Sequence, residues 1–78
     1  MKIRTNNELK EFEAALDKCT SEVWLMGPND EAYNMKNEEE CMNGIFRLAE
    51  EDADQFGIFT TTSHDEAIML PICEKLAA

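Results

Sequence analysis

The sequence has little positive charge, little glycine or proline, and a single histidine. Among its 78 residues, 7 are Lys or Arg and 17 are Asp or Glu, a formal net charge of −10. Binding to nucleic-acid backbones needs clustered Lys and Arg, so this balance argues against a nucleic-acid partner. Three Gly and two Pro exclude collagen-like and low-complexity chains. No apolar run approaches the roughly 20 residues of a membrane helix, and no apolar leader follows Met1. We therefore expect a cytoplasmic protein without membrane contact.

The cysteines and the histidine form no familiar metal or catalytic motif. Cys19, Cys41 and Cys73 are odd in number and far apart, whereas disulfide scaffolds carry an even and denser set. We expect them to behave as small buried apolar residues. His64 and Asp65 would make only half of a metal site, and no phosphate loop or nucleophile motif is present. The sequence therefore predicts no metal, no cofactor and no enzymatic activity.

Apolar residues make up 44% of the chain and recur with regular periods, as in an ordered globular protein. We expect a single domain over residues 1–78. The alternation in residues 1–4 predicts a short strand. The pattern Thr5-x-x-Glu8 is a capping box, and it precedes a helix-spaced apolar series. That series consists of Leu9, Phe12, Ala15, Leu16 and Cys19.

The middle of the chain predicts a hairpin followed by a helix. Residues 22–26 and 31–35 are strand-like and flank the turn sequence 27–30, where Gly27 and Asn29 tolerate positive φ. Asn37 and Glu40 cap a second helix. Gly44 inside it indicates close packing or a short, imperfect helix. The apolar positions expected on its buried side are Cys41, Met42, Ile45, Phe46, Leu48 and Ala49.

The last third of the chain predicts an acidic connection over 50–54, a strand over 55–61 and a third helix. Ser63 and Glu66 would cap this helix, and Pro71 would kink it or split it in two. The resulting order is β-α-β-β-α-β-α. Three amphipathic helices need an apolar surface to cover. We therefore expect an α+β open-faced sandwich, in which a four-stranded antiparallel sheet carries all three helices on one face.

Such a sheet leaves one face open, and strand alternation predicts which side chains lie on it. Val23, Leu25 and residues 56 and 58 should point toward the helices. Trp24, Met26 and Phe59 should then lie on the open side. These three are the candidate partner-binding residues, because a helix-free face bearing aromatic side chains can dock another protein. Simple cross-strand packing is the alternative explanation.

The element order and lengths resemble HPr, the histidine-containing phosphocarrier of the bacterial sugar phosphotransferase system. The resemblance spans almost the whole chain and includes the segments 9–23, 35–37, 42–48 and 63–67. It implies an HPr-like fold. The family's phosphoacceptor histidine caps the first helix, where this chain has Thr5-Asn6-Asn7-Glu8. The family's regulatory serine follows a lysine, and here Lys36 is followed by Asn37, which has no hydroxyl.

These departures predict a divergent, non-catalytic HPr-like protein that has lost phosphotransfer and binds an unidentified protein partner. Two alternatives stay open. One is an acidic decoy that binds the basic surface of a nucleic-acid-acting protein, suggested by the acids at 38–40 and 50–54. The other is a divergent phosphocarrier that uses His64, although His64 should lie far from the start of the first helix. Self-association through Trp24 and Phe59 would make the protein a weak homodimer rather than a monomer.

Overall fold

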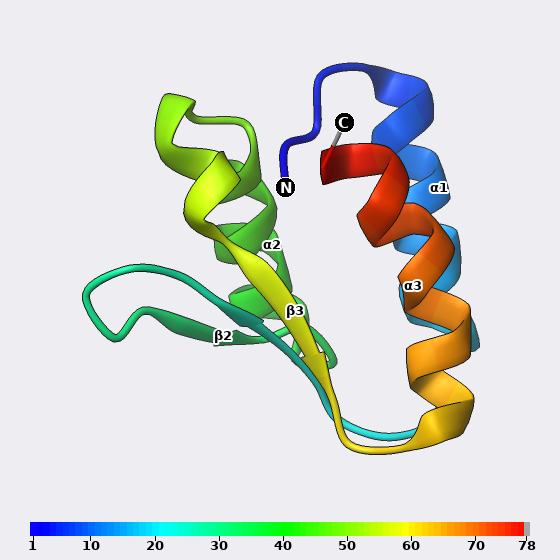
Figure 1. Ribbon diagram of the computed structural model, residues 1–78. Helices are drawn as coiled ribbons and strands as arrows, with labels where there is room; N and C mark the ends of the chain where they lie inside the picture. Colours follow the sequence, from blue (N-terminus) through cyan, green and yellow to red (C-terminus); the bar gives the residue numbers. More distant parts are fainter. Residues whose placement is uncertain (78) are drawn as a thin grey trace.

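The computed structural model describes residues 1–77, which form an α+β fold (Figure 1). Within this range there are three α-helices, one 3-10 helix and a three-stranded antiparallel sheet. In chain order the elements are α1 (Asn6–Lys18), β1 (Val23–Met26), β2 (Ala32–Asn34), α2 (Glu38–Leu48), η1 (Glu51–Gln55), β3 (Gly57–Thr60) and α3 (Ser63–Ala77). The expected α+β class is confirmed. The fourth strand is not formed in the described part of the chain.

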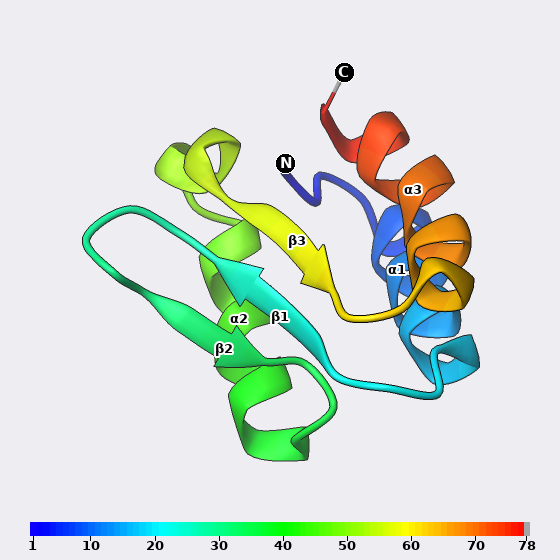
Figure 2. The same ribbon diagram turned by 60° about the horizontal axis from the view of Figure 1, so that its bottom comes forward.

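The sheet has the order β2-β1-β3, with β1 in the centre. β1 and β2 form the predicted hairpin, in which Leu25 lies opposite Tyr33. β3 pairs with the other edge of β1 and places Ile58 opposite Leu25. Figure 2 looks onto the face of the sheet that no helix crosses. In this view α2 lies behind the sheet, and α1 and α3 lie beyond the edge of β3. The sheet is narrower than expected.

Residues 1–4 were expected to form the fourth strand, and that prediction is wrong. Their hydrogen-bonding groups pair with the ends of other elements instead of with a neighbouring strand. The Met1 ammonium donates to the carbonyl of Ala53 (3.1 Å). The amides of Lys2 and Ile3 donate to the carbonyls of Leu76 and Leu48, both at 3.0 Å. Two of these acceptors lie in the last turn of a helix, where carbonyls have no partner within the helix. Met1 itself is buried, with 7% of its surface exposed.

Helix caps predicted from the sequence are formed at α1 and α2. The amide of Glu8 donates to the hydroxyl of Thr5 (3.1 Å), and the Glu8 carboxylate accepts from the amide of Arg4 (2.7 Å). At α2 the amide of Glu40 donates to the side chain of Asn37 (3.0 Å). These bonds satisfy amides that a helix start leaves unpaired.

The cap of α3 differs from the prediction by one residue. The hydroxyl that accepts from the first turn belongs to Thr62, with the amide of Asp65 at 3.1 Å. Ser63 is already the first residue of the helix. α3 also continues through Pro71 as one helix, so the predicted split into two pieces is wrong. Proline removes only one amide donor, and burial of Met69, Ile72 and Leu76 on the same helix holds both parts in place.

The core lies between the inner face of the sheet and the helices. It contains Val23 and Leu25 of β1, both fully buried, together with buried side chains of all three α-helices. The helix contributions are Phe12, Ala15, Leu16, Leu48, Met69, Ile72 and Leu76. Met42, Phe46 and Ala49 were also expected on the buried side of α2, and that prediction is wrong because all three are exposed, Met42 to 57% and Phe46 to 64%.

Two glycines owe their place to close packing. A Cβ on Gly44 would lie 2.9 Å from Sδ of Met35 and 3.1 Å from Cδ2 of Leu25, so α2 packs against the hairpin through bare backbone. A Cβ on Gly27 would lie 2.3 Å from the buried ring of Phe56. Gly27 does not have the expected positive φ. The left-handed residues of this turn are Asn29 and Asp30, at φ of 59° and 63°.

A lysine joins the end of α1 to the segment that follows β2. The ammonium of Lys36 donates to the carbonyl of Leu16 (2.8 Å) and to that of Cys19 (2.9 Å). Carbonyls at a helix carboxyl end are unpaired and carry partial negative charge, so a cation is favoured there. This contact ties the first helix to the hairpin and α2.

Candidate interaction surface

The predicted partner-binding residues lie together on the helix-free face of the sheet. Trp24 of β1 is directly opposite Phe59 of β3, and Met26 lies two residues along the same strand. Phe59 is 65% exposed and Met26 is 47% exposed, whereas Trp24 is partly buried. We call these three residues the open face. Alternation along β1 places Val23 and Leu25 in the core and these residues outside, as the sequence predicted.

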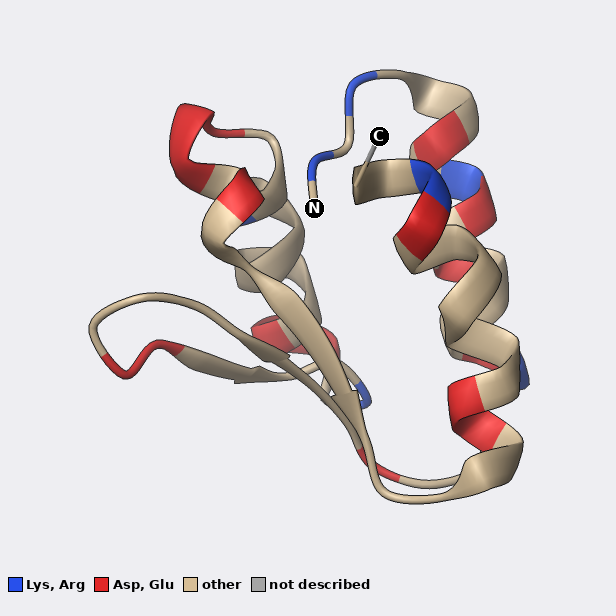
Figure 3. Ribbon diagram, in the orientation of Figure 1, with Lys and Arg blue, Asp and Glu red and all other residues tan. Residues whose placement is uncertain are grey.

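The open face is apolar and its strands carry no charge. β1 has the sequence VWLM and β3 the sequence GIFT, so neither contributes an ionisable side chain. On the neighbouring strand, Asn34 lies opposite Trp24 and Ala32 lies opposite Met26. Acidic residues lie on the helices and connections around the sheet (Figure 3). The surface therefore combines an uncharged aromatic centre with acidic surroundings.

A second apolar surface lies between α1 and α2 and was missed by the sequence analysis. A groove of about 650 Å³ there is lined by the exposed Met42 and Phe46 together with Leu9 and Ile45. The sequence did hold a signal for it. The apolar arc assigned to α2 runs over neighbouring positions and is wider than the stripe that one buried helix face requires. An arc of that width leaves part of its apolar surface outside the core.

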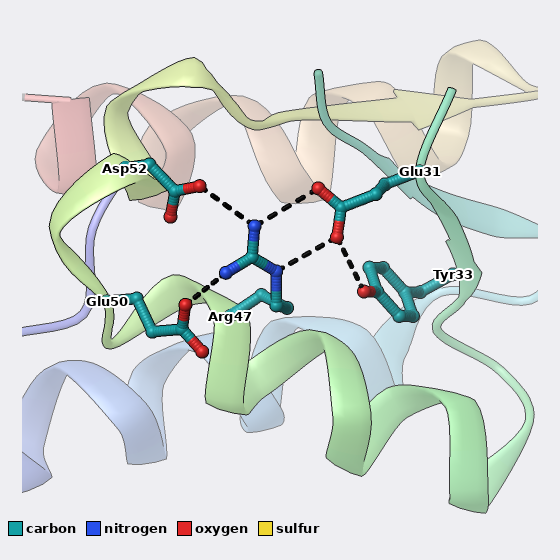
Figure 4. A network of polar contacts seen from close by, with 5 residues as sticks. All are labelled: Glu31, Tyr33, Arg47, Glu50 and Asp52. Carbon is teal, nitrogen blue, oxygen red and sulfur yellow. Dashed lines mark hydrogen bonds and ion pairs between the residues drawn. The ribbon is translucent and has the colours of Figure 1, made fainter. Parts of the chain in front are cut away.

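The most connected polar cluster surrounds Arg47 near the end of α2 (Figure 4). Its guanidinium donates two hydrogen bonds to Glu31 (2.9 and 3.1 Å) and one to Asp52 (2.9 Å), and it also pairs with Glu50. Its charge lies 5.1 Å from the centre of the Phe56 ring. With three carboxylates around it, Arg47 is not free to bind an anionic ligand. The cluster joins the hairpin to α2 and η1.

The ionisation of this cluster follows its contacts. The hydrogen bonds from Arg47 hold the pKa of Glu31 below its usual range, and the bonds to Glu31 and Asp52 raise the pKa of Arg47 further. Burial and the hydrogen bond to Glu31 raise the pKa of Tyr33. Glu31, Tyr33 and Arg47 therefore keep their ordinary charge states at neutral pH, and none of the three is set up as an acid or base.

His64 and Asp65 form the other notable polar pair. Asp65 is fully buried, and its carboxylate accepts hydrogen bonds from the amides of Thr20 (3.0 Å) and Ser21 (2.9 Å). Nδ1 of His64 lies 2.9 Å from the same carboxylate, and most of the His64 ring is exposed. The His64 contact, followed by the two amides, holds the pKa of Asp65 below its usual value. Asp65 thus fixes the start of α3 to the segment between α1 and β1.

The start of α1 carries none of the groups of a phosphohistidine site. Thr5 uses its hydroxyl to cap the helix, and Asn6 and Asn7 are exposed. The first turns of α1 and α3 lie at opposite ends of the helix pair, so His64 is remote from this position, as expected (Figure 1).

The cysteines are free thiols, and burial raises the pKa of each. Only Cys19 is fully buried as expected, whereas Cys41 and Cys73 are partly exposed. Among the described residues, no group of three or more His, Cys, Asp or Glu side chains is arranged to hold a metal ion.

No protein-family model, no curated protein and no solved structure matches the chain. Within residues 1–77, no helix combines the length and the apolar character needed to cross a lipid bilayer. The role of the protein must therefore be argued from its own surfaces.

Proposed function

We propose that the protein is a non-catalytic, HPr-like binding protein that docks a protein partner through the open face. The observation that carries this proposal is the exposure of Phe59 and Met26 beside Trp24 on an uncharged, helix-free sheet. Exposed aromatic and methionine side chains are enriched at protein interfaces, where burying them from water stabilises the complex. The proposal also draws on the resemblance of the element order from α1 to α3 to that of HPr, with the amino-terminal strand absent.

Loss of phosphotransfer is the second part of the proposal. A carrier needs an imidazole nucleophile beside a helix amino terminus and a positive group. Thr5, Asn6 and Asn7 supply no nucleophile of this kind, and His64 lies beside a buried carboxylate at the far end of the helix pair. Incubation with phosphoenolpyruvate and the general phosphotransferase enzyme should add no phosphoryl group by mass spectrometry. Acid-labile phosphate that disappears in His64→Ala would instead support the His64 carrier.

Two phenylalanines provide a matched test of the docking face. Phe59 on the open face and Phe46 on α2 are exposed to almost the same extent, 65% and 64%. We expect Phe59→Ala and Trp24→Ala to abolish capture of the partner from an extract of the source cell. Phe46→Ala should leave capture unchanged. Loss of the partner with Phe46→Ala alone would move the interface to the groove between α1 and α2. Urea unfolding of each variant checks that the fold is kept.

The net charge of −10 favours one competing function, the acidic decoy. The arrangement of the acids supports it less well than the open face supports docking. Acidic residues are distributed over α1, α2, η1 and α3, and Glu50 and Asp52 are already paired with Arg47 (Figure 3). A decoy would lose its partner steeply in high salt and keep it in Phe59→Ala, because exposed charges are screened while apolar contacts are not.

A further inference from the structure

The outer edge of β3 presents unpaired backbone groups. On β1, the carbonyl of Val23 and the amide of Gly27 bond toward β2, so odd-numbered residues of β1 face that strand. Trp24 and the other even-numbered residue of β1 therefore face β3, where their partners are Phe59 and Gly57. Backbone groups alternate along a strand, so the N–H and C=O of Ile58 and Thr60 point away from the sheet. Within residues 1–77 these groups make no hydrogen bond.

An apolar groove runs along this edge. It has a volume of about 510 Å³, lies between β3 and α3, and falls in the size range of natural ligand sites. Phe59 forms part of one wall, and Met69 and Leu70 of α3 form part of the other. Leu70 is 51% exposed. Figure 2 shows that the edge of β3 away from β1 faces α3. Backbone partners and apolar contacts are therefore available side by side.

Two acidic residues line the groove, one near each end of β3. Asp54 lies just before β3, and Glu66 lies in the first turn of α3, which follows β3. Both residues line the groove and are exposed. No Lys, Arg or His side chain lines it. Met1 does line it, and its ammonium donates to the carbonyl of Ala53 (3.1 Å). In the described part of the chain neither carboxylate forms an ion pair. An occupant with basic side chains at its two ends would complement this pattern.

We propose that an extended segment of a protein partner, with alternating apolar residues flanked by Lys or Arg, adds to β3 as a fourth strand. This inference rests on the proposed function and names the kind of partner. Main-chain bonds to Ile58 and Thr60 supply affinity, and apolar side chains enter the groove. Asp54 and Glu66 select the flanking basic residues. The added strand extends the open face, so a partner contacting Phe59 reaches the edge without crossing a charged surface.

A second copy of this chain is a poorer occupant. Each copy carries a net charge of −10, so two copies repel one another. In such a dimer, Asp54 and Glu66 of one copy would also face the acidic surface of the other copy. Residues 1–4 of a second copy are also not free to act as the added strand, because the amides of Lys2 and Ile3 donate to carbonyls at the ends of α3 and α2. A basic partner satisfies both the free backbone groups and the unpaired carboxylates.

The test uses a displayed library of random dodecapeptides as the probe for the full chain. We expect enriched peptides that alternate apolar residues and carry Lys or Arg toward their ends. Nuclear magnetic resonance of the labelled protein then measures amide hydrogen exchange. Peptide binding should slow exchange at Ile58 and Thr60 and leave Phe59 and Gly57 little changed, since these two already face β1.

Two matched pairs of variants separate backbone pairing from side-chain effects. Thr60→Pro removes the outward amide, fixes φ at this position and should weaken peptide binding about fivefold or more, the value of one hydrogen bond. Thr60→Ala keeps this amide and should bind like the natural chain. Asp54→Asn combined with Glu66→Gln should weaken binding about threefold at low salt. Glu38→Gln with Glu39→Gln removes the same charge from α2 and should have no effect.

The outcomes are distinct. Enrichment of no peptide, enrichment of acidic peptides, or equal binding by Thr60→Pro and Thr60→Ala would overturn strand addition. Met26 belongs to the open face and does not line the groove, so Met26→Ala separates the two surfaces. If binding is equal in the two Thr60 variants but is lost in Met26→Ala, docking on the open face stands and strand addition fails. If Met26→Ala also binds normally, the proposed function fails with it. Sedimentation showing a dimer that Thr60→Pro dissociates would replace the basic partner with a second copy.

Discussion

Replacing Gly44 with alanine sets two effects of opposite sign against each other. Alanine in a helix interior is favoured over glycine by about 1 kcal/mol, so propensity alone predicts a more stable protein. The added Cβ, however, would lie 2.9 Å from Sδ of Met35 and 3.1 Å from Cδ2 of Leu25. Ordinary contacts between non-bonded heavy atoms are about 3.5–4.0 Å. Both side chains must therefore move by about half an ångström.

The steric effect should be the larger one. Met35 is 3% exposed and Leu25 is completely buried, so neither has free space to move into. Overpacking of this kind costs about 1–3 kcal/mol. Subtracting the gain in propensity, we expect Gly44→Ala to lower the free energy of unfolding by about 1 kcal/mol. Urea unfolding followed by the fluorescence of the single tryptophan, Trp24, measures this difference.

A second substitution isolates the contact responsible. In a Met35→Ala background the space around Gly44 opens, and Gly44→Ala should then stabilise the protein by about 1 kcal/mol. The coupling between the two positions is thus about 2 kcal/mol in a double-mutant cycle. Asn43→Ala, at an exposed position of the same helix, is the control and should be stabilising in both backgrounds. Stabilisation by Gly44→Ala in the natural chain, without coupling to Met35, would refute the reasoning.

Three other measurements test the polar and thiol groups. Asp65→Asn should lower the melting temperature at pH 7, and this difference should shrink as the pH falls below about 4. The reason is that His64 and two amides stabilise Asp65 only while it is deprotonated. A difference in melting temperature that does not depend on pH would contradict this. Arg47→Lys should lower the melting temperature measured by calorimetry, because lysine cannot donate the paired hydrogen bonds to Glu31. An unchanged melting temperature would show that the cluster adds no stability. Cys19 should react with a thiol reagent only after unfolding, because it is 3% exposed and its pKa is raised. Peptide mapping by mass spectrometry measures this labelling. Rapid labelling of Cys19 in the native state would refute its burial.

Local patterns in the sequence predicted most of the elements. The caps at Thr5 and Asn37 depend on residues three positions apart, so the information lies within one turn of helix. Trp24 and Phe59 were placed on the open face by alternation alone, which has the same period in every strand. These predictions needed no knowledge of how distant segments meet.

The errors concern partners that only the tertiary structure supplies. Residues 1–4 alternate like a strand, but their amides bond to the ends of helices. Met42 and Phe46 continue an apolar pattern, but they line the groove between α1 and α2 and stay exposed. The groove between β3 and α3 lies along the edge of β3 that pairs with no strand within residues 1–77. No local pattern in the sequence predicts an edge without a neighbour.

The bonds from Lys36 to the carbonyls of Leu16 and Cys19 also bear on how the protein opens. Helix ends normally fray, but the carboxyl end of α1 is held by the side chain of Lys36, which follows β2. Fraying of α1 must therefore break these bonds, and their loss frees both segments at once. Helix end and hairpin should consequently open as one cooperative unit, with similar rates of exchange at their amides.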